Sequence, residues 1–376
     1  MTTEAVHKSL IDQPRLEFIL PGDPEQRTGG YLYDAHIVSE LRRQQWTVNV
    51  TGLQGRFPLV DPTACLAMSD ALTRQPDQAR VVIDGLALGN LPDAVEAHGQ
   101  RLDISALVHH PLADETGLDE VLRERLLQRE RQALGHCRRI IVTSRFSARR
   151  LIALGLTDHQ ASVIEPGVAP ARVSARVTER LAGRDPHLPE RWLCVASLTP
   201  RKGQDVLLDA LARLDSDAWC LDLVGSPERD PAFADSLRQQ IERLGLGSQV
   251  NLPGESDAAG LDHFYDQATL CVVPSWYEGY GMVVTEALAR GLPLIATTGG
   301  ALTDTVPDDA GLKVQPGDSG ALSRALKRWL DDTELRLTMS RRAAAHRNSL
   351  PNWTCAGRRF AQALLAQSRP PGNREP

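Results

Sequence analysis

The feature that most constrains the fold is the repeated alternation of short apolar segments with helical patterns along nearly the whole chain. Helical patterns occupy residues 30–43 and 118–135 of the first half. The strand candidates there are "LEFIL" (16–20), "WTVNV" (46–50), "RVVID" (80–84), "ISALV" (104–108), "RIIVT" (139–143) and "ASVI" (161–164). Such alternation predicts parallel strands that are covered by helices on both faces.

A second series of the same kind begins after the Pro-, Ala- and Arg-rich stretch 165–177. Its strand candidates are 192–198, 219–225, 249–252, 269–274 and 293–297, and its helical patterns are 204–214, 232–244, 258–266, 281–290 and 319–331. We therefore predict an α/β protein of two Rossmann-like, doubly wound domains that divide near residue 170. Ligands of such domains bind beyond the carboxyl ends of the strands, and with two domains we expect them in the cleft between.

Charge and hydropathy exclude several classes of function. The formal net charge of -6 and the pI near 6.0 argue against broad nucleic-acid binding, which needs a basic surface. No window approaches the length of apolar sequence that spans a membrane, and the first residues lack the apolar core of a signal peptide. We expect a cytoplasmic enzyme, and a peripheral position at the inner membrane face stays open.

The loop "WYEGYG" (276–281) lies between an apolar strand and a helix that ends at Gly291. The amides of residues 279–282 are expected to lack intrahelical partners, so they could bind a diphosphate. Glu278 precedes the helix and Glu286 lies on it, and carboxylates accept hydrogen bonds from sugar hydroxyls. A nucleotide sugar offers a diphosphate, a hexose and a ribose, so it would satisfy the whole pattern. The alternatives are a charge that complements the helix dipole for Glu278 and an ordinary exposed side chain for Glu286.

The segment "PSWYEGYGMVVTEALARGLPLIATTGG" (274–300) resembles the signature of the family 4 retaining glycosyltransferases, with its E-x7-E pair at Glu278 and Glu286. Four more segments resemble blocks of that family in the correct order: 29–50, 107–111, 163–168 and 195–211. The resemblance implies the GT-B fold, in which two Rossmann-like domains face each other across a cleft. The implied domains are an acceptor-side domain (1–170), a nucleotide-sugar domain (171–350), a helix that packs back on the first domain (351–368) and a frayed tail (369–376).

The resemblance also implies roles for individual residues. Glu278 would bind hexose hydroxyls near the reacting carbon, and Glu286 would bind the ribose. Lys202 would bind the diphosphate, where a fixed cation stabilises the leaving group. His109 would contact the transferred sugar, which makes the implied catalytic residues His109, Lys202 and Glu278. The implied donor-binding residues are Gly29, Gly30, Ser197, Arg201, Lys202, Glu278, Gly279, Tyr280, Gly281, Met282 and Glu286.

Other positions are less well determined by the resemblance. His110 is the alternative to His109, and Asp84, at the end of the strand "VID", is a candidate on the acceptor side. The family usually carries an Arg five residues before the Lys, where this chain has Ser197; we hypothesise that Arg201 supplies the missing charge. After the Gly-Gly pair at 299–300 the nearest acid is Asp304, one place later than is usual in the family.

The predicted function is retaining transfer of a hexose-type sugar from a nucleoside-diphosphate sugar, with a UDP-sugar favoured, to a hydroxyl acceptor. The D-x-D triplet at 215–217 reads as an ordinary turn, so no metal and no other cofactor is expected. Substitution on the same face of the sugar is favoured, with double displacement through a carboxylate as the alternative. The acceptor (a small molecule, a sugar or a lipid) and the oligomeric state are left open.

Three other functions are alternatives to this prediction. A GT-B nucleotide-sugar epimerase would use the same donor without an acceptor. A Rossmann oxidoreductase would need a G-x-G-x-x-G after a strand, and "GLALGN" (85–90) does not fit that pattern. A binding module without catalysis would have no use for the acid pair together with Lys202.

Overall fold

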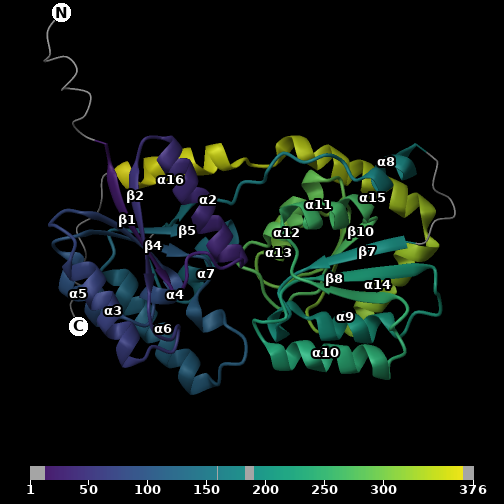
Figure 1. Cartoon of the computed structure of the whole chain (residues 1–376), viewed down its shortest axis with the longest axis horizontal. Coiled ribbons are helices and arrows are strands. Elements are labelled where there is room, and N and C mark those ends of the chain that lie inside the picture. Colours follow the sequence, from purple (N-terminus) through teal and green to yellow (C-terminus); the bar gives the residue numbers. More distant parts are fainter. Residues whose placement is uncertain (1–12, 159, 183–189, 367–376) are drawn as a thin grey trace, which may run out of the picture. The chain divides into compact units, whose positions relative to one another are not determined.

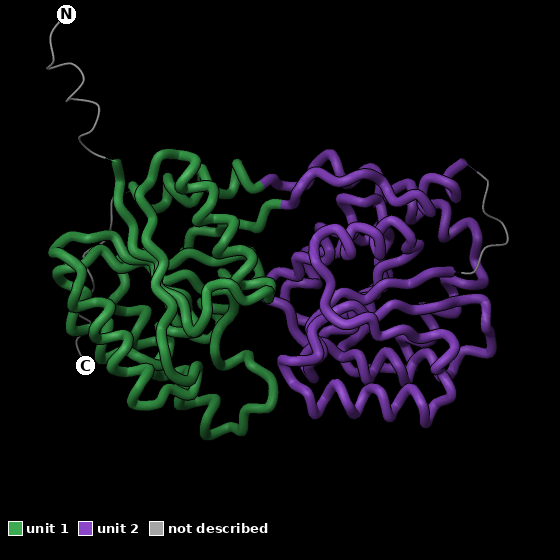
Figure 2. Tube along the Cα trace, in the orientation of Figure 1, with its two compact units in different colours: residues 1–167, 353–376 green, residues 168–352 purple. Residues whose placement is uncertain are grey.

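The computed structural model describes residues 13–158, 160–182 and 190–366, and the chain divides into two compact units (Figure 2). Unit 1 consists of residues 1–167 and 353–376, and unit 2 consists of residues 168–352. The boundary lies close to the split predicted near residue 170. The expected tail, 369–376, lies outside the described residues.

Unit 1 is built on a parallel six-stranded sheet with the order β2-β1-β3-β4-β5-β6. Its strands are β1 (Arg15–Pro21), β2 (Thr47–Leu53), β3 (Arg80–Asp84), β4 (Asp103–Val108), β5 (Arg139–Val142) and β6 (Ser162–Val163). The strand order reverses between β1 and β3, so this pair is the topological switch point of the unit. Ligands of open α/β sheets bind at such points, beyond the carboxyl ends of the strands.

Helices cover the sheet of unit 1 (Figure 1). They are α2 (Gly29–Arg43), α3 (Pro62–Thr73), α4 (Gly85–Leu88), α5 (Pro92–Gly99), η1 (Leu112–Asp114), α6 (Glu120–Gly135), α7 (Arg145–Ala153) and the C-terminal α16 (Trp353–Leu365). Successive side chains of a strand point to opposite faces of the sheet, so the core has two layers. Ile19 packs with residues of α3 and α5, whereas its neighbour Phe18 stacks on Phe360 of α16 with 6.4 Å between ring centroids. Helix α16 packs alongside α2, so the end of the described chain belongs to unit 1.

Unit 2 has a second parallel six-stranded sheet, with the order β12-β11-β10-β7-β8-β9. Its strands are β7 (Glu190–Val195), β8 (Trp219–Val224), β9 (Val250–Gly254), β10 (Leu270–Val273), β11 (Leu294–Thr297) and β12 (Gly311–Val314). Counted from β7, this is the 3-2-1-4-5-6 order of dinucleotide-binding domains, and the switch point lies between β7 and β10.

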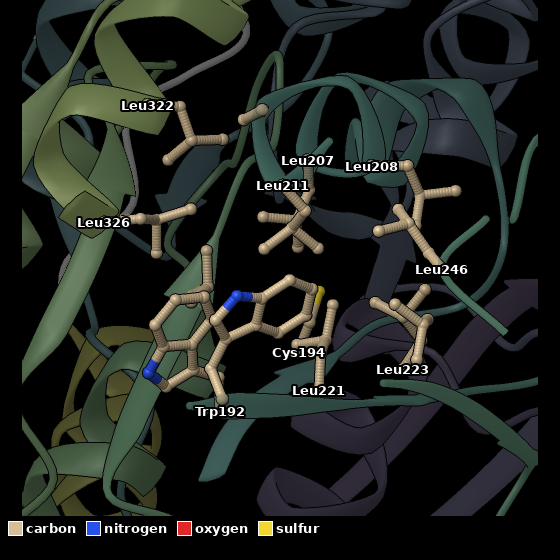
Figure 3. Packing of buried hydrophobic residues seen from close by; sticks show 14 of the residues in the cluster. Trp192, Cys194, Leu207, Leu208, Leu211, Leu221, Leu223, Leu246, Leu322 and Leu326 are labelled. Carbon is tan, nitrogen blue, oxygen red and sulfur yellow. The ribbon is translucent and has the colours of Figure 1, made fainter. Parts of the chain in front are cut away.

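The helices of unit 2 form a layer on each face of its sheet. They are α8 (Ala175–Leu181), η2 (Pro200–Lys202), α9 (Gln204–Leu211), α10 (Pro231–Arg243), α11 (Ala258–Gln267), α12 (Met282–Ala289), α13 (Leu302–Thr305), α14 (Ser319–Asp331), α15 (Thr333–His346) and η3 (Arg347–Ser349). On one face, the fully buried Trp192 of β7 packs with leucines of α9 and α14 (Figure 3). Its neighbour Leu193 points to the opposite layer with α11 and α12. Burial of each large side chain stabilises the fold by about 1.5–3 kcal/mol.

Every strand predicted from the sequence is present, and the predicted helices lie within a few residues of the observed ones. Strand β12, with the sequence "GLKV", is absent from the prediction because it is short and follows a polar turn without an apolar run. The two doubly wound sheets confirm the predicted fold class. None of the helices in the described ranges is long and apolar enough to cross a membrane.

Candidate functional site

The main cluster of predicted residues lies at the switch point of unit 2. Lys202 ends the short helix η2, which follows β7, and Glu278 lies in the loop that follows β10. Strands β7 and β10 are hydrogen-bonded neighbours in the parallel sheet, so the loops at their carboxyl ends emerge side by side. The topology therefore brings together two residues that are 76 positions apart in the chain.

A glycine allows the two loops to approach each other closely. Gly203 has φ +68°, and a Cβ atom there would lie 2.3 Å from the carbonyl oxygen of Pro274 at the end of β10. The amide of Trp276 donates to the carbonyl of Arg201 at 2.8 Å, which fixes one loop against the other. Any larger residue at 203 would push the Lys202 turn away from the Glu278 loop.

Glu278 is surrounded by donors and positive charge. Its Oε1 accepts a hydrogen bond from Lys202 Nζ at 2.6 Å and another from Ser275 Oγ at 2.7 Å. Arg201 Nη1 lies 3.7 Å from Oε2 and donates to the carbonyl of Tyr277 at 2.8 Å. The Glu278 side chain is 9% exposed and that of Lys202 is 19% exposed, so this ion pair is largely removed from water.

Burial and charge act in opposite directions on this pair. Burial opposes ionisation of Glu278, but Lys202 and Arg201 outweigh it and hold the pKa of the carboxyl below its ordinary value. Burial lowers the pKa of the Lys202 ammonium, against the attraction of Glu278. At neutral pH, Glu278 is ionised and faces two cationic side chains, which leaves the cluster with one excess positive charge.

The Gly-Gly pair at 299–300 holds the Glu278 backbone from the other side. The amide of Glu278 donates to the carbonyl of Gly299 at 3.3 Å, and the amide of Ala301 donates to the carbonyl of Glu278 at 2.8 Å. Gly300 has φ +61°, and a Cβ there would lie 2.4 Å from the Glu278 carbonyl oxygen. These glycines therefore position Glu278, whereas Asp304, the acid in question after them, is exposed on α13.

Helix α12 begins directly after the loop. Gly281 is its N-cap residue, with φ +86°, and no side chain caps its first turn. The N-terminus of a helix carries the positive end of the helix dipole, and the binding of a ligand by the amides of residues 279–282 stays a prediction. Met282, predicted to bind the donor, is the first residue of the helix, and the predicted neighbours Gly279 and Tyr280 lie between Glu278 and the cap.

Glu286 lies one turn further along α12 and is half-buried, so the alternative of an exposed helical side chain is wrong. Its Oε2 accepts a hydrogen bond from the hydroxyl of Tyr265 on α11 at 2.9 Å. Burial raises the pKa of Glu286 above its ordinary value, although that hydrogen bond and Arg290 act in the opposite direction. The two acids of the E-x7-E pair thus have different surroundings: Glu278 is paired with cations and Glu286 with a phenol.

Ser197 stands where the family pattern usually has an arginine, and Arg201 is the hypothesised replacement for its charge. The carbonyl oxygen of Ser197, in the loop after β7, accepts a hydrogen bond from Gln204 Nε2 at 3.0 Å. Arg201, not Ser197, brings charge to Glu278. The structure therefore places a guanidinium beside Lys202, which is what the substitution hypothesis requires, and its role in activity stays a prediction.

A second cluster lies at the switch point of unit 1. His109 follows β4, and its Nε2 lies 3.2 Å from Asp34 Oδ1 and 3.3 Å from Asp84 Oδ2. Asp84 ends β3, and its other oxygen accepts the amide of Leu86 at 2.7 Å. Asp34, on α2, is 1% exposed. Of the ligand-type side chains in the described residues, these three form the one group with the spacing of a metal site, with ligand atoms within 4.8 Å of one another.

The predicted glycines of unit 1 differ in their surroundings. A Cβ on Gly30 would lie 3.4 Å from the ring of His109, so Gly30 lets the start of α2 pack against this ring. A Cβ on Gly29 would meet nothing within 4 Å, so packing does not explain that glycine. His110 turns to another partner: its Nε2 lies 2.6 Å from Glu115 Oε1.

The D-x-D triplet 215–217 lies in an exposed loop at the start of β8. In a parallel sheet this is the edge opposite to the carboxyl ends, where Lys202 and Glu278 lie. The interpretation of the triplet as a turn is consistent with this position.

Sequence reasoning missed two side chains of these clusters. Ser275 donates to Glu278, and its place beside the acid in "PSWYE" was the available signal. Asp34 gave no usable signal, because it lies within the amphipathic pattern 30–43 and its partners come from two other strand ends.

Comparison with known proteins gives consistent results. The family described as "Glycosyl transferases group 1" matches residues 182–346. A D-inositol 3-phosphate glycosyltransferase of Salinispora arenicola is 31% identical over 246 residues, which is 58% of this chain and 52% of the relative. One from Corynebacterium glutamicum is 33% identical over 196 residues, 49% of this chain and 47% of the relative. The alignments thus span about half the length of these curated relatives.

Solved structures share the fold over most of the chain. Sucrose-phosphate synthase from Thermosynechococcus elongatus superimposes with a TM-score of 0.76 at 23% identity, covering 93% of this chain and 98% of that one. HepE from Anabaena, crystallised with UDP-glucose, gives a TM-score of 0.73 at 19% identity over 93% of this chain and 100% of its own. The chain is thus similar to the group 1 glycosyltransferases over residues 182–346, and its two parallel sheets have the GT-B fold of these solved structures.

Proposed function

We propose that the protein transfers a hexose-type sugar from a nucleoside-diphosphate sugar to a hydroxyl acceptor, with retention of the anomeric configuration and without a metal. The observation that carries this proposal is the Lys202–Glu278 pair at the switch point of unit 2, with Arg201 beside it. Cations and a carboxylate at one strand edge match a ligand that carries phosphates and hydroxyls side by side.

Donor binding would exchange the partners of this ion pair. The diphosphate would replace Glu278 as the partner of the Lys202 ammonium, and sugar hydroxyls would replace Lys202 as donors to the carboxylate. Each buried charge keeps a partner in both states, so the exchange avoids leaving an unpaired buried charge, which costs about 3–5 kcal/mol. Ser275, which donates to Glu278 at 2.7 Å, would hold the carboxylate in place during the exchange.

The other predicted residues would each bind a different part of the ligand. Glu286 would accept hydrogen bonds from the ribose through the oxygen that Tyr265 does not occupy. The first turn of α12 and the loop before it would contact the sugar and the diphosphate. His109 would contact the transferred sugar, and Asp84 and His110 remain the candidates for the acceptor side.

Metal-independent catalysis rests on the cationic side chains. Negative charge grows on the leaving diphosphate in the transition state, and a fixed cation there lowers the barrier. Lys202 and Arg201 supply two such charges on one short turn. Substitution on the same face follows if the leaving phosphate oxygen takes the acceptor's proton as an oxocarbenium-like centre forms; the alternative is a covalent glycosyl–enzyme intermediate.

The donor and the acceptor are to be found by experiment. UDP-sugars come first, since a protein of the same fold was crystallised with UDP-glucose. GDP- and ADP-sugars complete the donor panel. An inositol phosphate belongs in the acceptor panel because sequence relatives are named for one.

The test measures nucleoside-diphosphate release by chromatography, with and without each acceptor, and the product anomer by proton NMR. We expect release that depends on the acceptor, and a product with the donor's configuration. Glu278→Gln should reduce the rate by about 10²-fold because it loses an ionised hydrogen-bond acceptor. Lys327→Ala, on the exposed face of α14 and paired with Asp331, is the matched control and should retain full activity.

Each contrary outcome points to a different function. Conversion of the donor sugar without any acceptor would identify an epimerase. An inverted product would remove the claim of retention, and a trapped glycosyl–enzyme adduct would replace same-face substitution with double displacement. Full activity of Glu278→Gln would remove the acid from the mechanism.

A further inference from the structure

The His109 cluster of unit 1 contains a buried acid whose role the proposed function does not explain. Asp34, on α2, is 1% exposed and lies 3.2 Å from the Nε2 atom of His109. Asp84, at the end of β3, lies 3.3 Å from the same nitrogen. Two carboxylates from separate elements therefore meet one ring nitrogen.

The ring is also fixed by its other contacts. Tyr33 packs edge-on against it, with ring centroids 5.5 Å apart and an interplanar angle of 85°. A Cβ atom on Gly30 would lie 3.4 Å from Cδ2 and 3.5 Å from Nε2 of the ring, so the start of α2 lies close to it. The carbonyl of His109 accepts a hydrogen bond from Ser147 Oγ at 3.2 Å, which holds the backbone. Because the ring is held on these sides, its orientation is determined by the fold.

The hydrogen-bond inventory then determines which nitrogen is available. Ionised carboxylates only accept hydrogen bonds, so Nε2 must carry a hydrogen to satisfy Asp34 and Asp84. The remaining nitrogen, Nδ1, is left for a ligand. We propose that Asp34 is a positioning residue which, together with Asp84, holds His109 as a protonated imidazolium that presents Nδ1–H to the substrate.

The local electrostatics support this protonation state. Burial alone would lower the pKa of His109, but Asp34 and Asp84 together raise it to about 10. Burial raises the pKa of Asp34 to about 6 in spite of the attraction of His109, so this carboxyl is ionised above neutral pH. The third titratable group at the ring, Tyr33, stays neutral: burial raises its pKa well above the ordinary value, against the pull of Arg359 on α16.

The chemical consequence rests on the proposed function. An imidazolium donates a hydrogen bond to a sugar hydroxyl and cannot act as a general base. With two carboxylates and one imidazolium, the cluster carries one net negative charge, which favours the positive charge that develops on the sugar in an oxocarbenium-like transition state. Removal of the Asp34 charge would make the cluster neutral and would let His109 lose its proton at a lower pH.

The test is a long-range proton–nitrogen NMR titration of the full chain with 15N-labelled histidine. His109→Gln identifies the signal of His109. In the wild type we expect both ring nitrogens to be protonated at pH 8. In Asp34→Asn, which keeps the shape of the side chain and loses its charge, we expect the pKa of His109 to fall by at least about one unit. Glu17→Gln, which replaces a buried acid on β1 bonded to Asn49 and Thr51, is the matched control and should leave the signal unchanged.

The NMR result needs neither donor nor acceptor, so it tests the role of Asp34 even if the protein proves not to be a transferase. A neutral His109 ring at pH 8 in the wild type, or an unchanged pKa in Asp34→Asn, would overturn the proposal. Selective broadening of the His109 signal by sub-stoichiometric Mn²⁺ would also overturn it, in favour of a cation held by the three side chains. If Asp34→Asn does not fold, the wild-type titration and Asp84→Asn decide the question in the same way.

The effect of Asp34 on catalysis is measured separately, from the pH dependence of kcat. For Asp34→Asn we expect kcat, measured as nucleoside-diphosphate release, to decline at a pH at least about one unit lower than in the wild type, with KM for the donor changed less than about threefold. Glu17→Gln should keep the wild-type profile. A parallel loss at every pH would show a merely structural effect and contradict the positioning role.

Discussion

The two switch points carry clusters of the same kind with opposite charge balance. In unit 2, two cations flank one acid, Glu278, whereas in unit 1 two acids flank one imidazole, His109. Both clusters are built by loops and helices at the carboxyl ends of parallel strands, so the fold alone does not explain the difference. The opposite balances would suit the proposed reaction, in which a leaving diphosphate gains negative charge and the sugar gains positive charge.

The backbone devices of the two clusters differ as well. In unit 2, Gly203 and Gly300 sit at positive φ against carbonyls of the partner loop and bring whole backbone segments into contact. In unit 1, the contacts are made by side chains, with Gly30 leaving room for the His109 ring. Substitution of backbone-packed glycines should therefore disturb unit 2 more than a change of one side chain disturbs unit 1.

The largest effect is expected from Lys202→Ala. We expect the rate of sugar transfer to fall by about 10²–10³-fold, because the variant removes a fixed cation from the leaving group. The neighbouring Glu278 also loses its strongest partner, so donor binding should weaken. The measurement is kcat and KM from nucleoside-diphosphate release. If Lys202→Ala were as active as the control Lys327→Ala, the excess positive charge of the unit 2 cluster would not contribute to catalysis.

The clusters should also fail at opposite ends of the pH scale. The folded-state pKa of His109, about 10, is raised above its ordinary value of 6.5. Its contribution to stability is therefore fully present below about pH 6.5 and is lost as the pH rises toward 10. The pKa of Glu278 is depressed, so its contribution is present above its ordinary value and is lost as the pH falls.

This prediction is measured by chemical denaturation from about pH 3 to about pH 10. His109→Gln should flatten the alkaline decline, and Glu278→Gln should flatten the acid one. The contrast between the two clusters is contradicted if both variants alter the dependence of the free energy of unfolding on pH at the same end of the pH range.

A smaller effect is expected from Arg201→Ala. The guanidinium lies 3.7 Å from Glu278 and beside Lys202, so it would add a second charge to the proposed diphosphate site. We expect about a tenfold loss in kcat/KM, equivalent to about 1.4 kcal/mol. Arg201→Lys should restore part of it. Activity close to the wild type in Arg201→Ala would mean that nothing compensates for Ser197 at the family's arginine position.

The smallest effect is expected from removal of divalent metals. If Lys202 and Arg201 supply the positive charge, activity after treatment with EDTA should stay within about twofold of the untreated protein. Loss of activity that Mg²⁺ or Mn²⁺ restores would transfer the stabilising role to a metal. The Asp34, Asp84 and His109 group would then be the first place to look for it.

How far the sequence predicts this molecule depends on how local each feature is. The strands, the helix after "WYEGYG" and the acids Glu278 and Glu286 follow from patterns within a few residues of each other. The sequence does not show that Lys202 contacts Glu278, because that contact depends on the order of β7 and β10 in the sheet. The sequence does not reveal the contact of Asp34 with His109 for the same reason. The backbone contacts of Gly299 and Gly300 with Glu278 can be recognised only from the backbone geometry.

The most direct test of the central claim is calorimetric titration of the full chain with a nucleoside-diphosphate sugar, the corresponding nucleoside diphosphate and the nucleoside alone. In the wild type, one base should give binding in the range of about 1 μM to 1 mM. Lys202→Ala should weaken both phosphate-bearing ligands by about tenfold or more and leave the nucleoside unchanged. Equal affinities of the wild type and Lys202→Ala for the diphosphate ligands would contradict the assignment of this cluster as the diphosphate site.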